Sequence, residues 1–157
     1  MPRKAGTPAF FFGAALNTQT KKALLGSVRH WYSIAYAKGE TRGPENCALC
    51  LAFNNHDTHD AGIDCEGCPV ADVTRYRFCA RTPWDTWADH RRDEHRKCDP
   101  SAHGGVRGCV TCKRIAITEF EFLFSLLPTA DQKAAIKTKK FLKWKNPRVL
   151  PVAFMPS

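Results

Sequence analysis

Eight cysteines constrain this chain more than any other feature, because six of them form three Cys-x2-Cys pairs. The pairs and the two single cysteines are Cys47/Cys50, Cys65/Cys68, Cys109/Cys112, Cys79 and Cys98. A tight turn that carries two thiolates is the usual half of a tetrahedral zinc site. Eight thiolates are enough for two four-cysteine sites, so the spacing predicts two zinc ions per chain.

Three ways of sharing the cysteines between two ions exist, and proximity in the sequence favours one of them. Cys47, Cys50, Cys65 and Cys68 would hold one ion, with 14 residues between the two pairs. Cys79, Cys98, Cys109 and Cys112 would hold the other. An iron–sulfur cluster is a less favoured alternative, for which Cys68-Pro69 resembles the Cys-Pro element. A disulfide scaffold or a redox dithiol fits the pattern less well, since no βαβ pattern surrounds the pairs.

Basic residues concentrate at the two ends of the chain, whose formal net charge is +9. Residues 1–46 contain seven Lys and Arg against two acids, and residues 113–157 contain nine against three. Residues 47–68 contain four acids and neither Lys nor Arg. Thiolate-bound zinc would add negative charge to this acidic centre. The basic ends therefore predict a polyanionic partner.

The apolar pattern predicts helices on both sides of the cysteine pairs. Residues 18–38 have helical spacing with Thr18 or Thr20 as the cap, and a second helix starts at Thr82-Pro83-Trp84-Asp85 and runs to about Lys97. The strongest stripe lies between Ile115 and Leu127 and ends at Pro128. Between Cys47 and Arg81 we expect short turns and a small hairpin held by metal.

The last part of the chain is expected to be a basic helix with a proline-containing tail. Thr129-Ala130-Asp131-Gln132 has the form of a capping box, and the helix is expected to reach Trp144. These patterns divide the whole chain into three expected segments. They are a docking segment (1–17), a cysteine-rich metal-binding helical domain (18–128) and a basic helix with a proline-containing tail (129–157). The fold class is mainly α with irregular metal-stabilised loops, a small zinc-clamped helical domain with extended basic termini.

Three consecutive aromatic residues, Phe10, Phe11 and Phe12, form the centre of a short apolar run near the N-terminus. The run has eight residues, whereas a membrane span needs about 20, so we expect no membrane insertion. We expect this segment to dock on the protein's own core or on a host or phage protein.

Two histidine-containing strings are the places where a catalytic metal site could be built. One is the loop from His56 to Asp60, where imidazole and carboxylate groups could hold a hydrolytic metal. The other, His103 to Cys112, resembles part of the phage recombination endonucleases of the His-Asn-His type, but Lys113 stands where that family has an asparagine. Closed four-cysteine sites leave no open coordination position, so we expect a non-catalytic protein. His30, His90 and His95 are interpreted as surface or packing residues.

Four strings resemble small cysteine-rich proteins of tailed bacteriophages. They are Asn46-Cys47-Ala48-Leu49-Cys50, Asp64-Cys65-Glu66-Gly67-Cys68-Pro69-Val70, Cys79-Ala80-Arg81-Thr82-Pro83-Trp84 followed by Trp87, and Glu119 to Pro128. The resemblance covers about two thirds of the chain and implies no activity. It implies a phage accessory protein in the cytoplasm of the infected host, or a component of the virion.

The basic end predicts binding to nucleic acid or to a nucleoprotein machine. Its candidate residues are Lys133, Lys137, Lys139, Lys140, Lys143, Trp144, Lys145 and Arg148, with Phe141 interleaved. The cations would contact phosphates and the aromatic rings would stack on bases. A solvated helix without a ligand explains the charge equally well. The alternative function is a protein-interaction role, as a virion component or an inhibitor of a host defence or transcription complex.

Overall fold

The computed structural model describes residues 16–37, 39, 43–54, 64–93 and 110–152. These residues form α1 (Thr18–Tyr36), η1 (Gly43–Asn46), α2 (Ala48–Phe53), α3 (Pro69–Thr74), α4 (Pro83–Asp93), α5 (Val110–Ser125) and α6 (Thr129–Lys137). The mainly helical fold that the sequence predicts is confirmed. Within the described ranges there is no strand, so the hairpin expected before residue 81 is replaced by the short helices α2 and α3.

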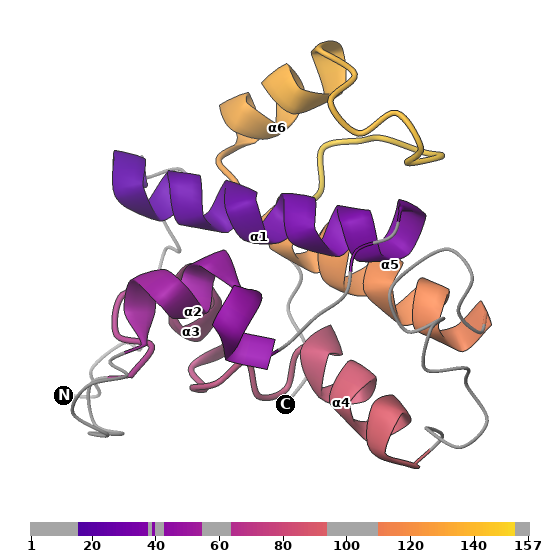
Figure 1. Ribbon diagram of the computed structural model, residues 1–157. Coiled ribbons are helices and arrows are strands. Elements are labelled where there is room, and N and C mark those ends of the chain that lie inside the picture. The colour runs from indigo at the N-terminus through magenta and orange to yellow at the C-terminus, as the bar shows by residue number, and fades with distance from the viewer. Residues whose placement is uncertain (1–15, 38, 40–42, 55–63, 94–109, 153–157) are drawn as a thin grey trace, which may run out of the picture.

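The helices α1 and α5 pack against each other and form the centre of the fold (Figure 1). Leu24, Val28 and Ala35 on α1 are fully buried, as are Ala116 and Phe120 on α5. Their spacing of four or seven residues places each set on one helical face, which burial then removes from water. The first turn of α1 is capped by Asn17 rather than by Thr18 or Thr20, since Asn17 Oδ1 accepts the Thr20 N–H at 2.8 Å. Figure 1 shows α6 above this pair and α2, α3 and α4 below it.

Tryptophans join α4 to the central pair. Trp31 of α1 makes edge-to-face contacts with Trp84 and Trp87 of α4, with centroid distances of 6.0 and 5.2 Å. The predicted start of α4 is confirmed: Thr82 Oγ1 accepts the Trp84 N–H at 3.2 Å, and Pro83 is the first helical residue. The expected end near Lys97 lies outside the described residues. These contacts hold the N-terminus of α4 beside α1 and the residues around Cys79.

The predicted last helix is shorter than expected, because α6 ends at Lys137 and not near Trp144. Lys139 has a left-handed backbone (φ 51°) and the Lys140 N–H bonds to Ala135 O, which ends the helical ladder. The capping box is also wrong: Thr129 is the first helical residue, and Pro128, which precedes it, provides no side-chain cap.

The turns after α6 place two aromatic residues in the core. Phe141 and Trp144 are 7% and 4% exposed, and Trp144 packs against Phe120 and Phe124 at centroid distances of 5.1 and 4.9 Å. Trp144 Nε1 donates to Glu121 Oε1 at 2.9 Å. The segment expected to be a separate basic end therefore shares the core of α1 and α5. None of the helices in the described part of the chain is both long and apolar enough to cross a membrane.

Candidate metal centre

The first cysteine pair is fixed to α1 by a buried serine. Cys47 is the residue before α2, and Cys50 follows one turn later on that helix. Ser27, fully buried on α1, accepts the Leu49 N–H at 3.1 Å, and its Oγ lies 3.6 Å from Cys47 Sγ. A Cβ added at Gly26 would lie 2.9 Å from Ala48 Cβ, so a glycine is needed where the two helices approach. The pair thus has a defined position on the central helix.

The second cysteine pair forms a tight turn between Phe53 and α3. Cys65 and Gly67 have left-handed backbones with φ values of 64° and 78°, and the Cys68 N–H bonds to Cys65 O at 3.0 Å. The Cys65 N–H bonds to Phe53 O at 3.0 Å, which joins this turn to the end of α2. Cys65 Sγ donates to Asn54 Oδ1 at 3.2 Å and accepts from the backbone N–H of Phe78 at 3.4 Å. The side chains of Cys65 and Cys68 are buried.

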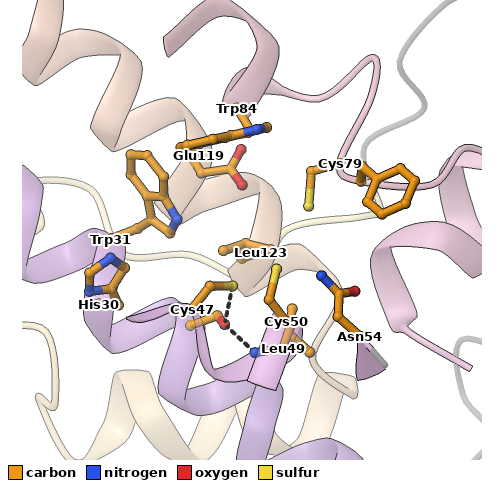
Figure 2. Close-up of a pocket in the computed structure, with 12 residues that line it drawn as sticks. His30, Trp31, Cys47, Leu49, Cys50, Asn54, Cys79, Trp84, Glu119 and Leu123 are labelled. Atoms are coloured by element: carbon orange, nitrogen blue, oxygen red, sulfur yellow. Dashed lines mark hydrogen bonds between the residues drawn. The ribbon is translucent and has the colours of Figure 1, made fainter. Parts of the chain in front are cut away.

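Cys79 belongs with these two pairs in space. A cavity of about 10 Å³ is lined by Cys50, Cys65, Cys68 and Cys79 among other residues. Cys50 and Cys79 also line an adjoining cavity of about 160 Å³, together with Cys47. Figure 2 shows the sulfur atoms of Cys47, Cys50 and Cys79 turned toward the larger cavity. Five thiols from three separate segments therefore line two cavities that share part of their walls.

The larger cavity also contains two polar groups that the sequence analysis missed or dismissed. Glu119, on α5, is 2% exposed, and its Oε2 has no hydrogen-bond partner among the described residues. His30, on α1, has a buried Nε2 that likewise lacks a partner within the described part of the chain. Figure 2 places the Glu119 carboxyl group between Trp84 and the thiols. The sequence did contain a signal for Glu119, because an acidic residue within the apolar stripe of α5 is unusual.

Burial and neighbouring charges set the protonation of the thiols. The pKa of Cys47 is lowered to about 6, mainly because the Cys50 thiol donates a hydrogen bond to it. The backbone N–H groups of Cys50 and Leu49 and the Ser27 hydroxyl lower this pKa further, whereas burial opposes the shift. The same pairing, followed by burial, raises the pKa of Cys50. Burial raises the pKa of Cys68 to about 11 and also raises that of Cys79. A bound divalent cation reverses this balance, because it deprotonates the thiols that it binds.

The acid and the histidine in the cavity are likewise biased toward their neutral forms. Burial raises the pKa of Glu119 to about 8, and negative charge at Cys47 adds to the effect, whereas the hydrogen bond from the Trp84 backbone N–H opposes it. Burial lowers the pKa of His30. Without a cation, most of the groups around the cavity resist charge.

Cys112 lies apart from this group and has a histidine neighbour. It is 3% exposed on α5, and its Sγ lies 3.2 Å from His90 Nε2 on α4. His90 was interpreted as a surface or packing residue, and its only sequence signal was its place on the helix after Cys79. Cys98 and Cys109 lie outside the described residues. The structure places Cys79 with the first two pairs, not with Cys112 as sequence proximity suggested.

The described cysteines are soft donors, but they are not arranged as a metal site. Cys47, Cys50, Cys65, Cys68 and Cys79 are free thiols. Among the residues that the structure describes, no group of three or more His, Cys, Asp or Glu side chains is arranged to hold an ion. Soft thiol donors suit zinc. Backbone N–H groups that bond to Cys47, Cys65 and Cys68 are the kind of outer contacts that stabilise thiolates.

Some of the other predicted sites lie among the described residues and some do not. The loop from His56 to Asp60, the string from His103 to Gly108 and residues Phe10 to Phe12 lie outside the described residues. The predicted basic cations are all exposed: Lys133, Lys137, Lys139, Lys140, Lys143, Lys145 and Arg148. Trp144 is buried, and Phe141 is too, so stacking of these rings on bases is wrong as an interpretation.

No family model, no curated protein and no solved structure matches this chain. The resemblance to proteins of tailed bacteriophages therefore stays a prediction from the sequence. The case for function depends on the residues themselves.

Proposed function

We propose that this protein is a non-catalytic, metal-stabilised helical module that binds nucleic acid or a nucleoprotein complex through its basic C-terminal surface. The observation that carries the metal part is the meeting of five thiols from three segments around two adjoining cavities. Zinc is the metal proposed, with Cys47, Cys50, Cys65, Cys68 and Cys79 as its thiolate donors. Bound zinc supplies a fixed positive centre that holds otherwise separate loops together.

A metal at this place would stabilise the part of the fold that has the least regular structure. The helices α2 and α3 have six residues each, too short to be stable by themselves. Cys47 and Cys50 are fixed to α1 through Ser27, and Cys79 precedes the N-terminus of α4. Metal bonds would therefore join the short helices to the rigid α1–α5 pair.

The second part of the proposal concerns the cations of α6 and the turns after it. Lys139 and Lys140 are exposed, and Lys140 lies near Arg29 of α1: burial is the main cause that lowers its pKa, and the charge of Arg29 is the next. Cations that repel each other favour an anionic ligand. Phosphate groups would relieve this repulsion, and the buried aromatics would support the surface rather than contact bases.

A salt titration with labelled DNA and RNA oligonucleotides tests the nucleic-acid proposal. For binding driven by phosphate contacts, the logarithm of the association constant falls linearly with the logarithm of the salt concentration. The double variant Lys139→Ala, Lys140→Ala should reduce the slope by about two, since each phosphate contact contributes roughly one. A matched control is Arg75→Ala, Arg77→Ala, two exposed cations that follow α3 on the other side of the central helices (Figure 1). Equal slopes for both double variants and the parent would contradict the proposal.

A protein partner is the second candidate, favoured by an apolar pocket on the same C-terminal segment. The pocket has a volume of about 220 Å³ and is lined by Ala135, Ile136, Lys139, Phe141, Leu142, Trp144 and Pro147. Leu142 is 77% exposed at this place. Binding through such a surface would change little with salt. A host-lysate pull-down with and without nuclease treatment separates the two candidates. We propose that the protein meets either partner in the cytoplasm of an infected bacterium or in a virion, which the resemblance to phage proteins supports.

A further inference from the structure

One side of the larger cavity is built from aromatic and aliphatic side chains and not from thiols. Trp31 of α1 and Trp84 of α4 meet there with ring centroids 6.0 Å apart, and Leu123 of α5 lines the same space. Figure 2 shows both indole rings next to the Glu119 carboxyl group, with Cys50 across the cavity from them. The volume of about 160 Å³ is close to that of an apolar cavity that holds one benzene molecule. The space therefore suits a small aromatic body.

The polar end of this space is the Glu119 carboxyl group. The Trp84 backbone N–H donates to it, and Oε2 is buried without a hydrogen-bond partner among the described residues. Burial raises the pKa of Glu119 to about 8, so the group carries a proton at neutral pH and is able to donate a hydrogen bond. A buried polar group without a partner is costly. The arrangement therefore favours a ligand that brings a hydrogen-bond acceptor to Glu119.

Water alone would fill this space poorly. A buried water molecule makes about three hydrogen bonds. The two tryptophans, Leu49 and Leu123 provide apolar walls, so water placed away from Glu119 and His30 would have few partners. An aromatic molecule with one polar end would contact these walls and still reach Glu119. The lining thus favours such a molecule over solvent and over a fully apolar ligand.

We propose that the larger cavity is a binding site for a small, neutral, planar heteroaromatic molecule whose hydrogen-bond acceptor meets Glu119. The ring lies against Trp31 and Trp84, and a carbonyl oxygen or ring nitrogen accepts the hydrogen bond that Glu119 donates. No cation is needed, because a protonated carboxyl group is neutral. This site goes beyond the metal-binding and nucleic-acid-binding functions proposed above and depends on neither.

Pyridone, in the isomer with neighbouring N–H and C=O groups, tests the site by calorimetry and NMR of the full chain, with zinc present throughout. Benzene is the comparison probe, since it has a similar size and no acceptor. Pyridone should bind more tightly than benzene and shift the indole N–H signals of Trp31 and Trp84, but not that of Trp144. Tetramethylammonium, a cation that would need the ionised carboxylate, should not bind. Tighter binding of this cation than of pyridone, a shift confined to Trp144, or no binding of pyridone would overturn the proposal.

Variants at Glu119 test the hydrogen bond itself. Glu119→Gln keeps an acceptor for the Trp84 N–H and an N–H donor for the ligand, so it should retain the preference for pyridone over benzene. Glu119→Leu removes the donor, and the preference should fall roughly 3- to 10-fold, as expected for one neutral hydrogen bond. Glu121→Gln, on the same helix but bonded to Trp144, is the control and should match the parent. An unchanged preference in Glu119→Leu would overturn the role of Glu119.

A variant of the apolar wall covers the case in which changes at position 119 prevent folding. In Leu123→Phe the larger side chain occupies part of the cavity, so binding of both pyridone and benzene should be lost. Leu142→Phe, at an exposed position outside the cavity, is the matched control and should bind both probes as the parent does. Parental binding in a folded Leu123→Phe protein would place the probes elsewhere and overturn the proposal.

Discussion

Gln132 is joined to Leu150 by two hydrogen bonds: its Nε2 donates to Leu150 O at 3.2 Å, and its Oε1 accepts the Leu150 N–H at 2.8 Å. The same Nε2 also lies 3.3 Å from Ser125 O and 3.0 Å from Leu127 O. The side chain is 2% exposed. A single buried amide therefore connects the end of α5, the start of α6 and the C-terminal segment, which the sequence predicted to be an extended, proline-containing tail.

Replacing this amide should destabilise the whole fold. Gln132→Ala would remove the hydrogen-bond partner of the buried Leu127 O and of the partly buried N–H and C=O of Leu150, and a buried group left without a partner costs about 1–3 kcal/mol. We expect the free energy of unfolding in urea to fall by roughly 3 kcal/mol. The exposed Gln19→Ala is the control and should change stability by less than about 0.5 kcal/mol. Equal urea midpoints for the two variants would show that the Leu150 contact contributes nothing.

Trp144 and Lys145 are neighbours in the sequence that should affect different properties. Trp144→Ala removes a buried ring from contact with Phe120 and Phe124, and a core change of this kind costs about 3–5 kcal/mol. Lys145 is exposed, so Lys145→Ala should leave the thermal midpoint unchanged and weaken only the salt-dependent binding to nucleic acid. Thermal melts and oligonucleotide titrations of both variants provide the measurement. A Trp144→Ala protein with parental stability would restore the stacking interpretation.

The sequence predicted the long helices well because their apolar spacing is maintained over several turns. The starts of α1 and α4 and the apolar stripe of α5 could be located from Leu24, Thr82 and Phe120 and their neighbours. The end of α6 could not, because the left-handed turn at Lys139 interrupts a pattern that otherwise continues to Trp144. Local residue preference favours a longer helix there, and burial of two aromatic rings favours the turn.

The candidate site could be predicted only in its donor types. Cysteine spacing predicts metal binding, which stays a prediction, and sequence distance does not reveal which thiols meet in space. Cys79 is 11 residues from Cys68 and lines a cavity with Cys50, Cys65 and Cys68, because the left-handed residues Phe78 and Cys79 turn the chain back toward Cys65. Glu119 is separated from the pairs in sequence and reaches the cavity only through the packing of α5.

Because α1 and α2 approach closely at Gly26, Gly26→Ala should destabilise the parent but stabilise a variant in which Ala48 is replaced by glycine. Gly26→Ala would place a Cβ 2.9 Å from Ala48 Cβ, and this overlap should cost about 1–3 kcal/mol, more than the roughly 1 kcal/mol gained from helix propensity. In an Ala48→Gly background the overlap is gone, so the same change should stabilise the protein by about 1 kcal/mol. The free energy of chemical unfolding is measured for the parent, Gly26→Ala, Ala48→Gly and the double variant. The same sign in both backgrounds would mean that the helices separate freely.

Metal removal should loosen one side of the fold and leave the other intact. A zinc chelator should increase hydrogen exchange in α2, α3 and the turn that contains Cys65, because metal binding contributes folding free energy there. The aromatic core around Phe120 and Phe124 should keep its protection. The chelator saturated with zinc beforehand is the control. Uniform loss of protection would indicate a metal-dependent fold throughout, and unchanged protection would argue against a bound metal.

Cys79 should couple energetically to Cys65 and not to His90. Cys79 and Cys65 line one cavity, whereas His90 lies next to Cys112 and is seven residues after Pro83, about 10 Å along α4. Cys65→Ser and Cys79→Ser should both disrupt the same metal-bound structure, so their combined loss of stability should be smaller than the sum by more than about 1 kcal/mol. Cys79→Ser and His90→Ala should add to within about 0.5 kcal/mol, because His90 contacts Cys112 whereas Cys79 lines the cavity with Cys65. Unfolding free energies of the single and double variants, measured in the presence of zinc, give the coupling energy of Cys79 with Cys65 and that of Cys79 with His90. Coupling of Cys79 to His90, with additivity between Cys79 and Cys65, would return Cys79 to the ligand group that sequence proximity first suggested.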